Sequence, residues 1–284
     1  MLKKLRIVTL SENTVAANGF HAEWGLSLYA ETDEGNFLLD TGNGGSAVRN
    51  AERLGIGLGS IDKLVLSHSH ADHTGGLRDF LQRRDKEIEV IAHPDVFGLT
   101  YVAKDGKNLF RGIPFRREEL ESLGAKFTLT VAPMQLSANV LTTGEVPMVT
   151  DFEKVVDNVS RREGAQMVPD EVKDDLSIVL KTDHGLVVML GCSHRGVVNH
   201  ILHAQEITGV KRIHTVVGGC HLFNASAERI RKTVDALREF DVQQLGVSHC
   251  TGMKASAAMM QQFGERFYFN NAGSVKTVPA QAGQ

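Results

Sequence analysis

Residues 67–76 read SHSHADHTGG and directly follow the apolar run KLVLS, which has the composition of a buried strand. His68, His70, Asp72 and His73 lie within six positions of this segment. Ionisable groups this dense are costly to pack together unless something binds them. Because α/β proteins place their sites at the carboxyl ends of strands, the pattern predicts an α/β fold with a metal site at this strand end. The alternative is a chance cluster on a solvated loop.

The spacing of these residues suits two metal ions. His68 and His70 lie two positions apart in a turning loop and can face one metal, while Asp72 and His73 can reach a second. Imidazole and carboxylate are ligands for zinc, iron and manganese, and we expect two divalent ions, zinc first. Two metals held roughly 3.5–4 Å apart can activate a water molecule, so hydrolysis is the expected chemistry.

Composition narrows the class of protein. The 284 residues are 42% hydrophobic and 23% charged, as in an ordinary globular protein, and the net charge of −3 predicts no nucleic-acid or membrane partner. The start, MLKKLRIVTL, reads as a strand rather than a signal peptide. Three cysteines, an odd number, argue against disulfides, and we expect a cytoplasmic protein. We expect a small-molecule substrate; the oligomeric state, a homo-oligomer included, stays open.

The chain alternates strand and helix signals without repeats or linkers. Strands are predicted at 5–10, 25–32, 36–40, 63–67, 177–182, 185–190, 213–218, 244–248 and 266–270. Helices are predicted at 46–55, from about Gly76 onward, and at 225–240. Residues 95–173 have a weaker pattern and are expected to form a partly irregular insertion or lid, and the tail 278–284 is expected to fray. The pattern predicts a single domain, residues 1–284, with two sheets packed face to face under outer helices.

HxHxDH at a strand end, preceded by FLLDTG with Asp40, resembles the metallo-β-lactamase superfamily. The resemblance implies a four-layer αβ/βα sandwich, with two mixed sheets face to face and a binuclear metal site between them. It places Asp40 behind the site, orienting a ligand or a backbone turn. A strand-end aspartate that caps the TGNGG turn is the alternative reading of Asp40.

A narrower resemblance covers nearly the whole chain. The blocks GFHAEWGLSLYAE, FLLDTGNGG, NAERLGI, IDKLVLSHSHADHTGGL, GEVP, LGCSHRGVVN, VVGGCHL and VSHCTG occur in order. Together they resemble the branch that includes the 7,8-dihydropterin-6-methyl-4-(β-D-ribofuranosyl)aminobenzene-5'-phosphate synthases and their bacterial relatives. Two positions depart from that branch: Trp24 stands where it usually has histidine, and Met148 where it usually has arginine. Specificity is expected to depend on the loops near both positions and on residues 95–173.

The resemblance also assigns the remaining site residues. His194 in LGCSH and His249 in VSHCTG are expected to be metal ligands, and Cys192 stands where relatives have a bridging aspartate or a cysteine ligand. His221 in GGCHL is expected to face the substrate as a proton donor, although a histidine at a helix start is equally compatible. Asp174 or Asp175 either replaces a further histidine ligand or caps a strand.

The other histidines have no such placement: His184 is expected in a hairpin turn, and His200 and His203 at the surface or in support of the site. Three functions remain open. The first is a binuclear metal-dependent hydrolase of a small phosphorylated or anionic metabolite, with Asp72 as both ligand and proton acceptor. The second is a dihydropterin-type synthase that joins a pterin methyl diphosphate to an aryl amine. The third is a non-catalytic metal-binding sensor.

Overall fold

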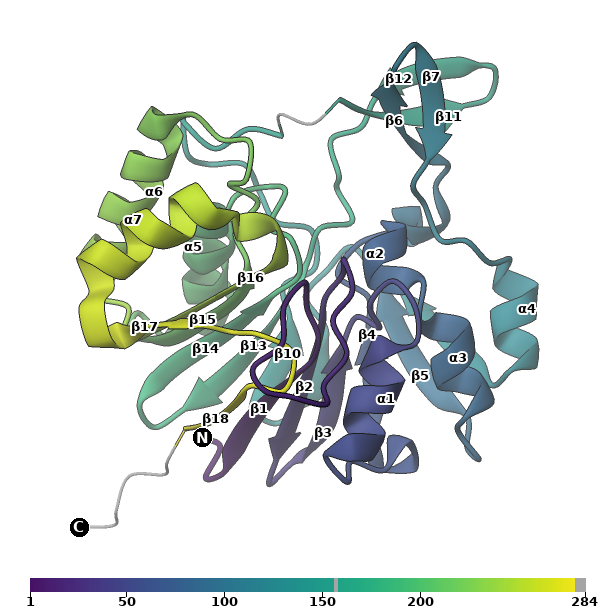
Figure 1. Cartoon of the computed structure of the whole chain (residues 1–284), viewed down its shortest axis with the longest axis horizontal. Coiled ribbons are helices and arrows are strands. Elements are labelled where there is room, and N and C mark those ends of the chain that lie inside the picture. The colour runs from purple at the N-terminus through teal and green to yellow at the C-terminus, as the bar shows by residue number, and fades with distance from the viewer. Residues whose placement is uncertain (156–157, 279–284) are drawn as a thin grey trace.

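The computed structural model describes residues 1–155 and 158–278, and Figure 1 shows its arrangement. The predicted fraying of the tail therefore lies almost entirely outside the described residues. Within them, most strands belong to two large sheets that face each other, with helices on both outer sides. This is the four-layer αβ/βα sandwich that the sequence predicts.

The first sheet is built mainly from the N-terminal half and has the order β18-β1-β2-β3-β4-β5-β8. Its strands are β1 (Leu5–Ser11), β2 (Ser27–Thr32), β3 (Gly35–Leu39), β4 (Lys63–Val65), β5 (Ile88–Ala92), β8 (Ala125–Leu129) and β18 (Val275–Val278). The pairs from β3 to β8 are parallel, and the others are antiparallel. The parallel pairing brings the carboxyl ends of β3, β4 and β5 to one edge.

The second sheet has the order β17-β16-β15-β14-β13-β10-β9 and is also mixed. Its strands are β9 (Gln135–Ser137), β10 (Val140–Thr142), β13 (Ser177–Thr182), β14 (Gly185–Leu190), β15 (Ile213–Gly219), β16 (Gln244–Ser248) and β17 (Phe267–Phe269). The strands β14 to β17 are parallel. His184 lies in the turn between β13 and β14, as predicted.

Helices cover the outer face of each sheet. The helices are α1 (Ser46–Arg53), α2 (Ala71–Thr74), α3 (Leu77–Gln82), α4 (Arg117–Ser122), α5 (Val197–Thr208), α6 (Ala227–Glu239) and α7 (Met253–Phe263). Short 3₁₀ turns are η1 (Leu58–Ser60), η2 (Pro94–Phe97), η3 (His249–Thr251) and η4 (Gly264–Arg266). Apolar residues of α1, α3 and α4 pack on the first sheet, and those of α5, α6 and α7 pack on the second. In the described residues, no helix is both long and apolar enough to cross a membrane.

A third core layer joins the two sheets. Leu28 and Leu39 of the first sheet belong to one buried cluster with Ile178, Met189 and Val217 of the second. Burying each such side chain contributes about 1.5–3 kcal/mol, so this layer holds the two halves in a fixed relation. The loops at the carboxyl ends of β4, β14 and β16 can therefore form one site.

Residues 95–173, predicted as a partly irregular insertion or lid, do not form one separate unit. The segment supplies β8, β9 and β10 to the large sheets and α4 to an outer layer. Only β6 (Thr100–Lys104), β7 (Lys107–Phe110), β11 (Val159–Glu163) and β12 (Gln166–Pro169) stand apart, as a small antiparallel sheet. Figure 1 shows this small sheet projecting from the body near the site edge.

Close backbone packing fixes the loop after β4. A Cβ atom on Gly76 would lie 2.1 Å from the carbonyl oxygen of Thr41, although its φ is an ordinary −79°. The Gly76 amide also donates a hydrogen bond to the carbonyl of Gly42, at 3.1 Å. The TGNGG turn and the HTGG segment therefore touch backbone to backbone.

Replacing Gly76 with alanine should overpack this contact. For Gly76→Ala we expect the free energy of unfolding to fall by about 1–3 kcal/mol, measured by urea denaturation. Gly57→Ala is the matched control, because Gly57 has a φ of −70° and no atom within 4 Å of the added Cβ. Equal stabilities of the two variants would contradict the packing argument.

Candidate metal centre

The histidine loop brings three imidazole rings around one point. The ring centroids of His68 and His70 lie 4.6 Å apart, and His194 lies 4.8 Å from His68 and 4.7 Å from His70. His194 follows β14 of the other sheet, so the group spans both halves. The Nε2 atoms of His68 and His70 are buried without a hydrogen-bond partner in the described part of the chain. Buried polar atoms are rarely left in this state unless a ligand uses them.

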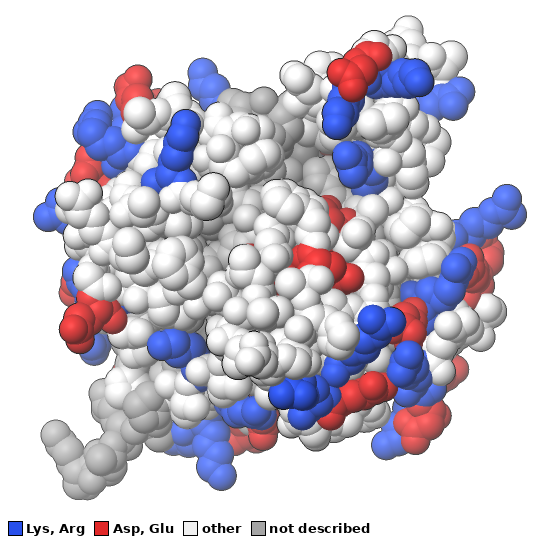
Figure 2. All heavy atoms as spheres, in the orientation of Figure 1, with Lys and Arg blue, Asp and Glu red and all other residues white. Residues whose placement is uncertain are grey.

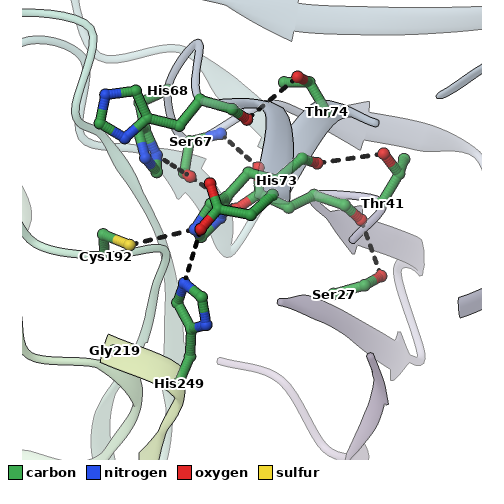
Figure 3. A network of polar contacts seen from close by, with 12 residues as sticks. Ser27, Thr41, Ser67, His68, His73, Thr74, Cys192, Gly219 and His249 are labelled. Carbon is green, nitrogen blue, oxygen red and sulfur yellow. Dashed lines mark hydrogen bonds and ion pairs between the residues drawn. The ribbon is translucent and has the colours of Figure 1, made fainter. Parts of the chain in front are cut away.

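A second group lies directly beside the first. His249 in η3 places its ring 5.1 Å from that of His73, and its Nε2 lies 3.3 Å from Oδ2 of Asp72. Figure 3 shows Cys192 and His249 directed toward His73 from the opposite half of the molecule. The structure therefore brings Asp72, His73 and His249 together, as the sequence predicts.

Cys192 lies between the two groups. Its Sγ is 3.1 Å from Nε2 of His73. Three sets of candidate ligand atoms share this thiol, and two of them lie on the two sides of the cluster: His68 with His194, and His73 with His249, with all atoms of a set within 4.8 Å of one another. A side chain common to two ligand sets is what a bridging ligand requires. Burial raises the pKa of the Cys192 thiol well above its usual range, so it needs a nearby cation to become a thiolate.

A buried carboxylate holds the loop from behind. Asp40 accepts hydrogen bonds from the amide of Ser67 at 2.7 Å and its hydroxyl at 2.6 Å, and pairs with Nδ1 of His73 at 2.6 Å. Nδ1 of His68 lies 2.9 Å from the same hydroxyl. Because Nδ1 of His68 and Nδ1 of His73 are occupied by these contacts, the Nε2 atoms of both rings face the site. Asp40 thus orients both a histidine and a backbone turn.

The electrostatics favour neutral imidazoles on the side of His68 and His70. Burial lowers the pKa of His70 to about 3 and that of His68 well below its usual range, with neighbouring histidines adding to the effect. Burial also acts on His73, but the Asp40 carboxylate outweighs it and raises the pKa to about 9. Burial opposes ionisation of Asp72, yet the His249 hydrogen bond and the charge of His73 hold its pKa well below the usual range.

These residues fit divalent metal ions. Neutral imidazole, carboxylate and thiolate are the donors that zinc accepts, and the histidine and carboxylate subset also suits iron or manganese. His68, His70 and His194 would hold one ion, and Asp72, His73 and His249 a second, with Cys192 between them. The orphaned Nε2 atoms of His68 and His70 are the observation that supports this fit.

A cavity of about 490 Å³ opens from this cluster toward the small sheet. His221 lines the cavity, with its ring 4.0 Å from that of His194 and 5.3 Å from that of Phe223. Trp24 also lines it, 54% exposed, and its indole N–H donates to Oδ2 of Asp72 at 3.1 Å. Met148 is not among the residues that line this cavity.

Asp174 and Asp175 lie behind the cluster. Their carboxylates contact a backbone amide and a histidine, and neither residue lines the cavity. Oδ2 of Asp174 accepts the Ser69 amide at 2.7 Å, which fixes the loop between His68 and His70. Asp175 contacts Nε2 of His200 at 3.0 Å. His200 is completely buried, so of its two predicted positions, at the surface or in support of the site, the surface is excluded. Asp175 also accepts the amide of Arg195, next to His194, at 2.8 Å.

Several site residues have left-handed backbone conformations that are uncommon outside glycine. Asp40, Ser193, His221 and His249 have φ values of 61°, 58°, 45° and 51°. Each costs of order 1 kcal/mol and persists only because the surrounding structure over-determines it. For His249, the restraint includes hydrogen bonds to the side chains of Glu12 and Asn13.

Sequence reasoning did not assign four residues of the site. Cys250 forms a further group of candidate ligand atoms with Cys192 and His221, and the only signal was its position next to His249. Arg111 and Phe223 line the cavity but belong to no motif. Trp24 stood out as a departure from the branch pattern, but its contact with Asp72 was not predictable.

Residues 25–205 match the family model of the metallo-beta-lactamase superfamily. The chain belongs to this superfamily. It is 32% identical over 282 residues to the 7,8-dihydropterin-6-methyl-4-(beta-D-ribofuranosyl)-aminobenzene-5'-phosphate synthase of Methanocaldococcus jannaschii, covering 95% of this chain and 96% of that protein. Both resemblances seen in the sequence are thus confirmed.

Two solved superfamily structures have the same fold. Tm1679, described as a metal-dependent hydrolase of the beta-lactamase superfamily, superposes with a TM-score of 0.84 and 27% identity over 97% of this chain and 99% of that one. YhfI from Bacillus subtilis has a TM-score of 0.59 and 11% identity over 96% of this chain and 99% of its own, which shows the fold alone.

The buried Asp174 carboxyl gives a testable pH dependence. Burial raises its pKa to about 7, against about 3.9 in an unfolded chain. Between these values the folded state keeps a proton that the unfolded state has lost, so this group lowers stability as pH rises from about 4 to 7. Asp174→Asn keeps an oxygen acceptor for Ser69 but does not titrate. In chelator-treated protein we expect Asp174→Asn to have the higher Tm at pH 8 and the smaller loss of Tm between pH 5 and 8.

Differential scanning calorimetry at several pH values measures this difference. The exposed Asp85→Asn variant is the control and should follow the wild-type profile. If the profiles of Asp174→Asn and wild type run parallel, Asp174 does not titrate in this range.

Proposed function

We propose that this protein is a binuclear metal-dependent hydrolase that acts on a small phosphorylated or otherwise anionic metabolite. The observation that carries the proposal is the pair of ligand groups that share Cys192 and border a cavity of about 490 Å³. Two divalent metal ions, when bound, supply Lewis acidity and activate water. Superfamily membership and the likeness to a metal-dependent hydrolase at 27% identity support this chemistry.

Individual residues of the chain would then have separate roles. Asp72, ionised at neutral pH, is suited to be a ligand, and the indole N–H of Trp24 and the ring of His249 hold its Oδ2 in place. A carboxylate with so low a pKa is a weak proton acceptor, so the ligand role of Asp72 is the better supported of its two roles. His221 lines the cavity beside His194, which supports a role in donating a proton to a leaving group or in stabilising developing negative charge.

A dihydropterin-type synthase is the second candidate. It is favoured by the 32% identity to the Methanocaldococcus jannaschii synthase across nearly the full length of both chains. In that reaction class an aryl amine displaces diphosphate from a pterin methylene carbon, and the same cluster would bind the departing diphosphate. Trp24 in place of the branch's usual histidine changes the wall of the cavity next to Asp72.

Metal content is the first test of the proposal. Elemental mass spectrometry of purified protein should find close to two divalent ions per chain. We expect the double variant His68→Ala, His249→Ala to lose them, because each substitution removes a ligand of a different ion. His184→Ala, in the β13–β14 turn, is the matched control and should keep both. One ion per chain in the wild type would mean that Cys192 or His249 is misassigned, and none would favour a sensor.

Turnover separates the candidate reactions. On a panel of esters, lactones and phosphoesters, we expect His221→Asn to keep its metal and lose about 10²–10⁴-fold in kcat, as for a positioned proton donor. Asp72→Ala should lose both metal and activity. Full hydrolysis by Asp72→Ala would exclude the proposed metal centre as the place of hydrolysis, and failure to bind a dihydropterin diphosphate at millimolar levels would exclude the synthase.

A further inference from the structure

One cationic side chain lines the cavity on the side away from the candidate ligands. Arg111 directly follows β7 of the small sheet, and it is the only lysine or arginine among the lining residues that the structure describes. The cavity separates this sheet from the floor formed by residues such as His70 and Asp72. Figure 2 shows the hollow beneath the small sheet, with basic side chains at the edge that this sheet forms.

The backbone of Arg111 is tied to the histidine loop. Its carbonyl oxygen accepts a hydrogen bond from the amide of Ala71 at 2.7 Å, and its own amide donates to the carbonyl of Thr100 at 2.8 Å. Ala71 lies between His70 and Asp72 in the sequence. The small sheet therefore holds Arg111 at a fixed position over the candidate metal ligands.

The Arg111 guanidinium has no ion pair with any described residue, and the side chain is exposed. Arg161 of the same small sheet differs, because Asp95 at 2.6 Å and Glu163 at 2.7 Å neutralise it. A guanidinium presents a planar fork of N–H donors that matches the two oxygens of a carboxylate or phosphate. Arg111 has no acidic partner among the residues that the structure describes, and it is thus available for an anionic group of a ligand in the cavity.

The remaining walls favour a flat ligand body between Arg111 and the metal ligands. Trp24 is 54% exposed and packs its ring 5.2 Å from that of His249, and Phe223 is 42% exposed beside His221. Each aromatic residue therefore lies next to one side of the candidate metal centre. Exposed aromatic rings in a cavity provide stacking surface for a planar group.

We propose that Arg111 binds a second anionic group, a phosphate or carboxylate, of an aryl substrate whose reacting end lies at the metal centre. This inference rests on the proposed function, since it takes the metal centre as the place of reaction. The proposed substrate class has two anionic ends separated by a planar ring. The Arg111 site is distinct from the candidate metal ligands because it discriminates among substrates without changing the metal content.

Two non-hydrolysable phosphonates test the assignment on the metal-loaded, full-length protein. Phenylphosphonate has one anionic end, and 4-phosphonobenzoate has a second across the ring. Trp24 is the only tryptophan of the chain and lines the same cavity, so its fluorescence reports binding of both. For Arg111→Ala we expect about a tenfold weaker Kd for 4-phosphonobenzoate, as for a lost charge-assisted hydrogen bond, and less than about a twofold change for phenylphosphonate.

Two further variants test whether the effect of Arg111→Ala on binding is indirect. Arg111→Lys should retain part of the affinity, because it keeps the charge without the planar fork. Arg162→Ala removes an exposed arginine of the same small sheet that does not line the cavity, and it should bind both phosphonates as the wild type does. Metal content should be unchanged in every variant.

The outcomes are distinguishable. Arg111→Ala that binds 4-phosphonobenzoate as tightly as wild type overturns the inference, and so does an equal loss for both phosphonates, while the proposed function stands. Wild-type protein that carries two metals but binds neither phosphonate overturns the inference together with the proposed preference for anionic metabolites. A selective loss for 4-phosphonobenzoate supports the Arg111 site.

Discussion

The site depends on one buried carboxylate. Asp40, at the end of β3, is completely buried, and its backbone amide is bonded to the carbonyl of Val65 at the end of β4. Its side chain holds the Ser67 amide, the Ser67 hydroxyl and the imidazole of His73. Because a buried charge without such partners would be very costly, the carboxylate enforces a single arrangement of the histidine loop. His73, held in this way, presents Nε2 to Cys192 of the other half.

Apolar packing, rather than the polar cluster, holds the two halves in their relative positions. Leucine, isoleucine, valine and methionine side chains from both sheets interlock between them, and this layer aligns the carboxyl ends of β4, β14 and β16. The histidines of the first half therefore lie next to those of the second because the sheets pack together, and no long loop has to bring them there. A metal bound there would link two chain segments that are more than a hundred residues apart in sequence.

Much of this arrangement was readable from the sequence, for a physical reason. The strands 177–182, 185–190 and 244–248 were predicted with their observed bounds, because each is an apolar run ended by glycine, aspartate or histidine. The strands β6 and β7 were missed, because KNLF is exposed at every position and TYVAK is only partly buried, so neither shows the alternation of a half-buried strand.

Within the site, too, some residues could be predicted from the sequence and others could not. The histidine cluster at His68 could be placed because α/β proteins collect their sites at strand ends. His194 and His249 also follow strands, but it was the family resemblance that assigned them to the metal centre. Arg111 and Phe223 reach the cavity through loops, whose paths are set by tertiary contacts such as the bond between Arg111 and Ala71. The sequence left His200 either at the surface or in support of the site, and only the structure shows that Asp175 and Ser177 bind it in the interior.

The left-handed conformations of Asp40, Ser193, His221 and His249 bear on how such a chain can evolve. Glycine would relax the backbone at each of these positions, yet glycine has no side chain to bind a metal, donate a proton or hold a loop. Stability alone would therefore favour glycine at these four positions, whereas the side chains present there are the ones that the site needs. A descendant that lost its activity would be free to drift toward glycine at these positions first, before any change reached the apolar layer between the sheets.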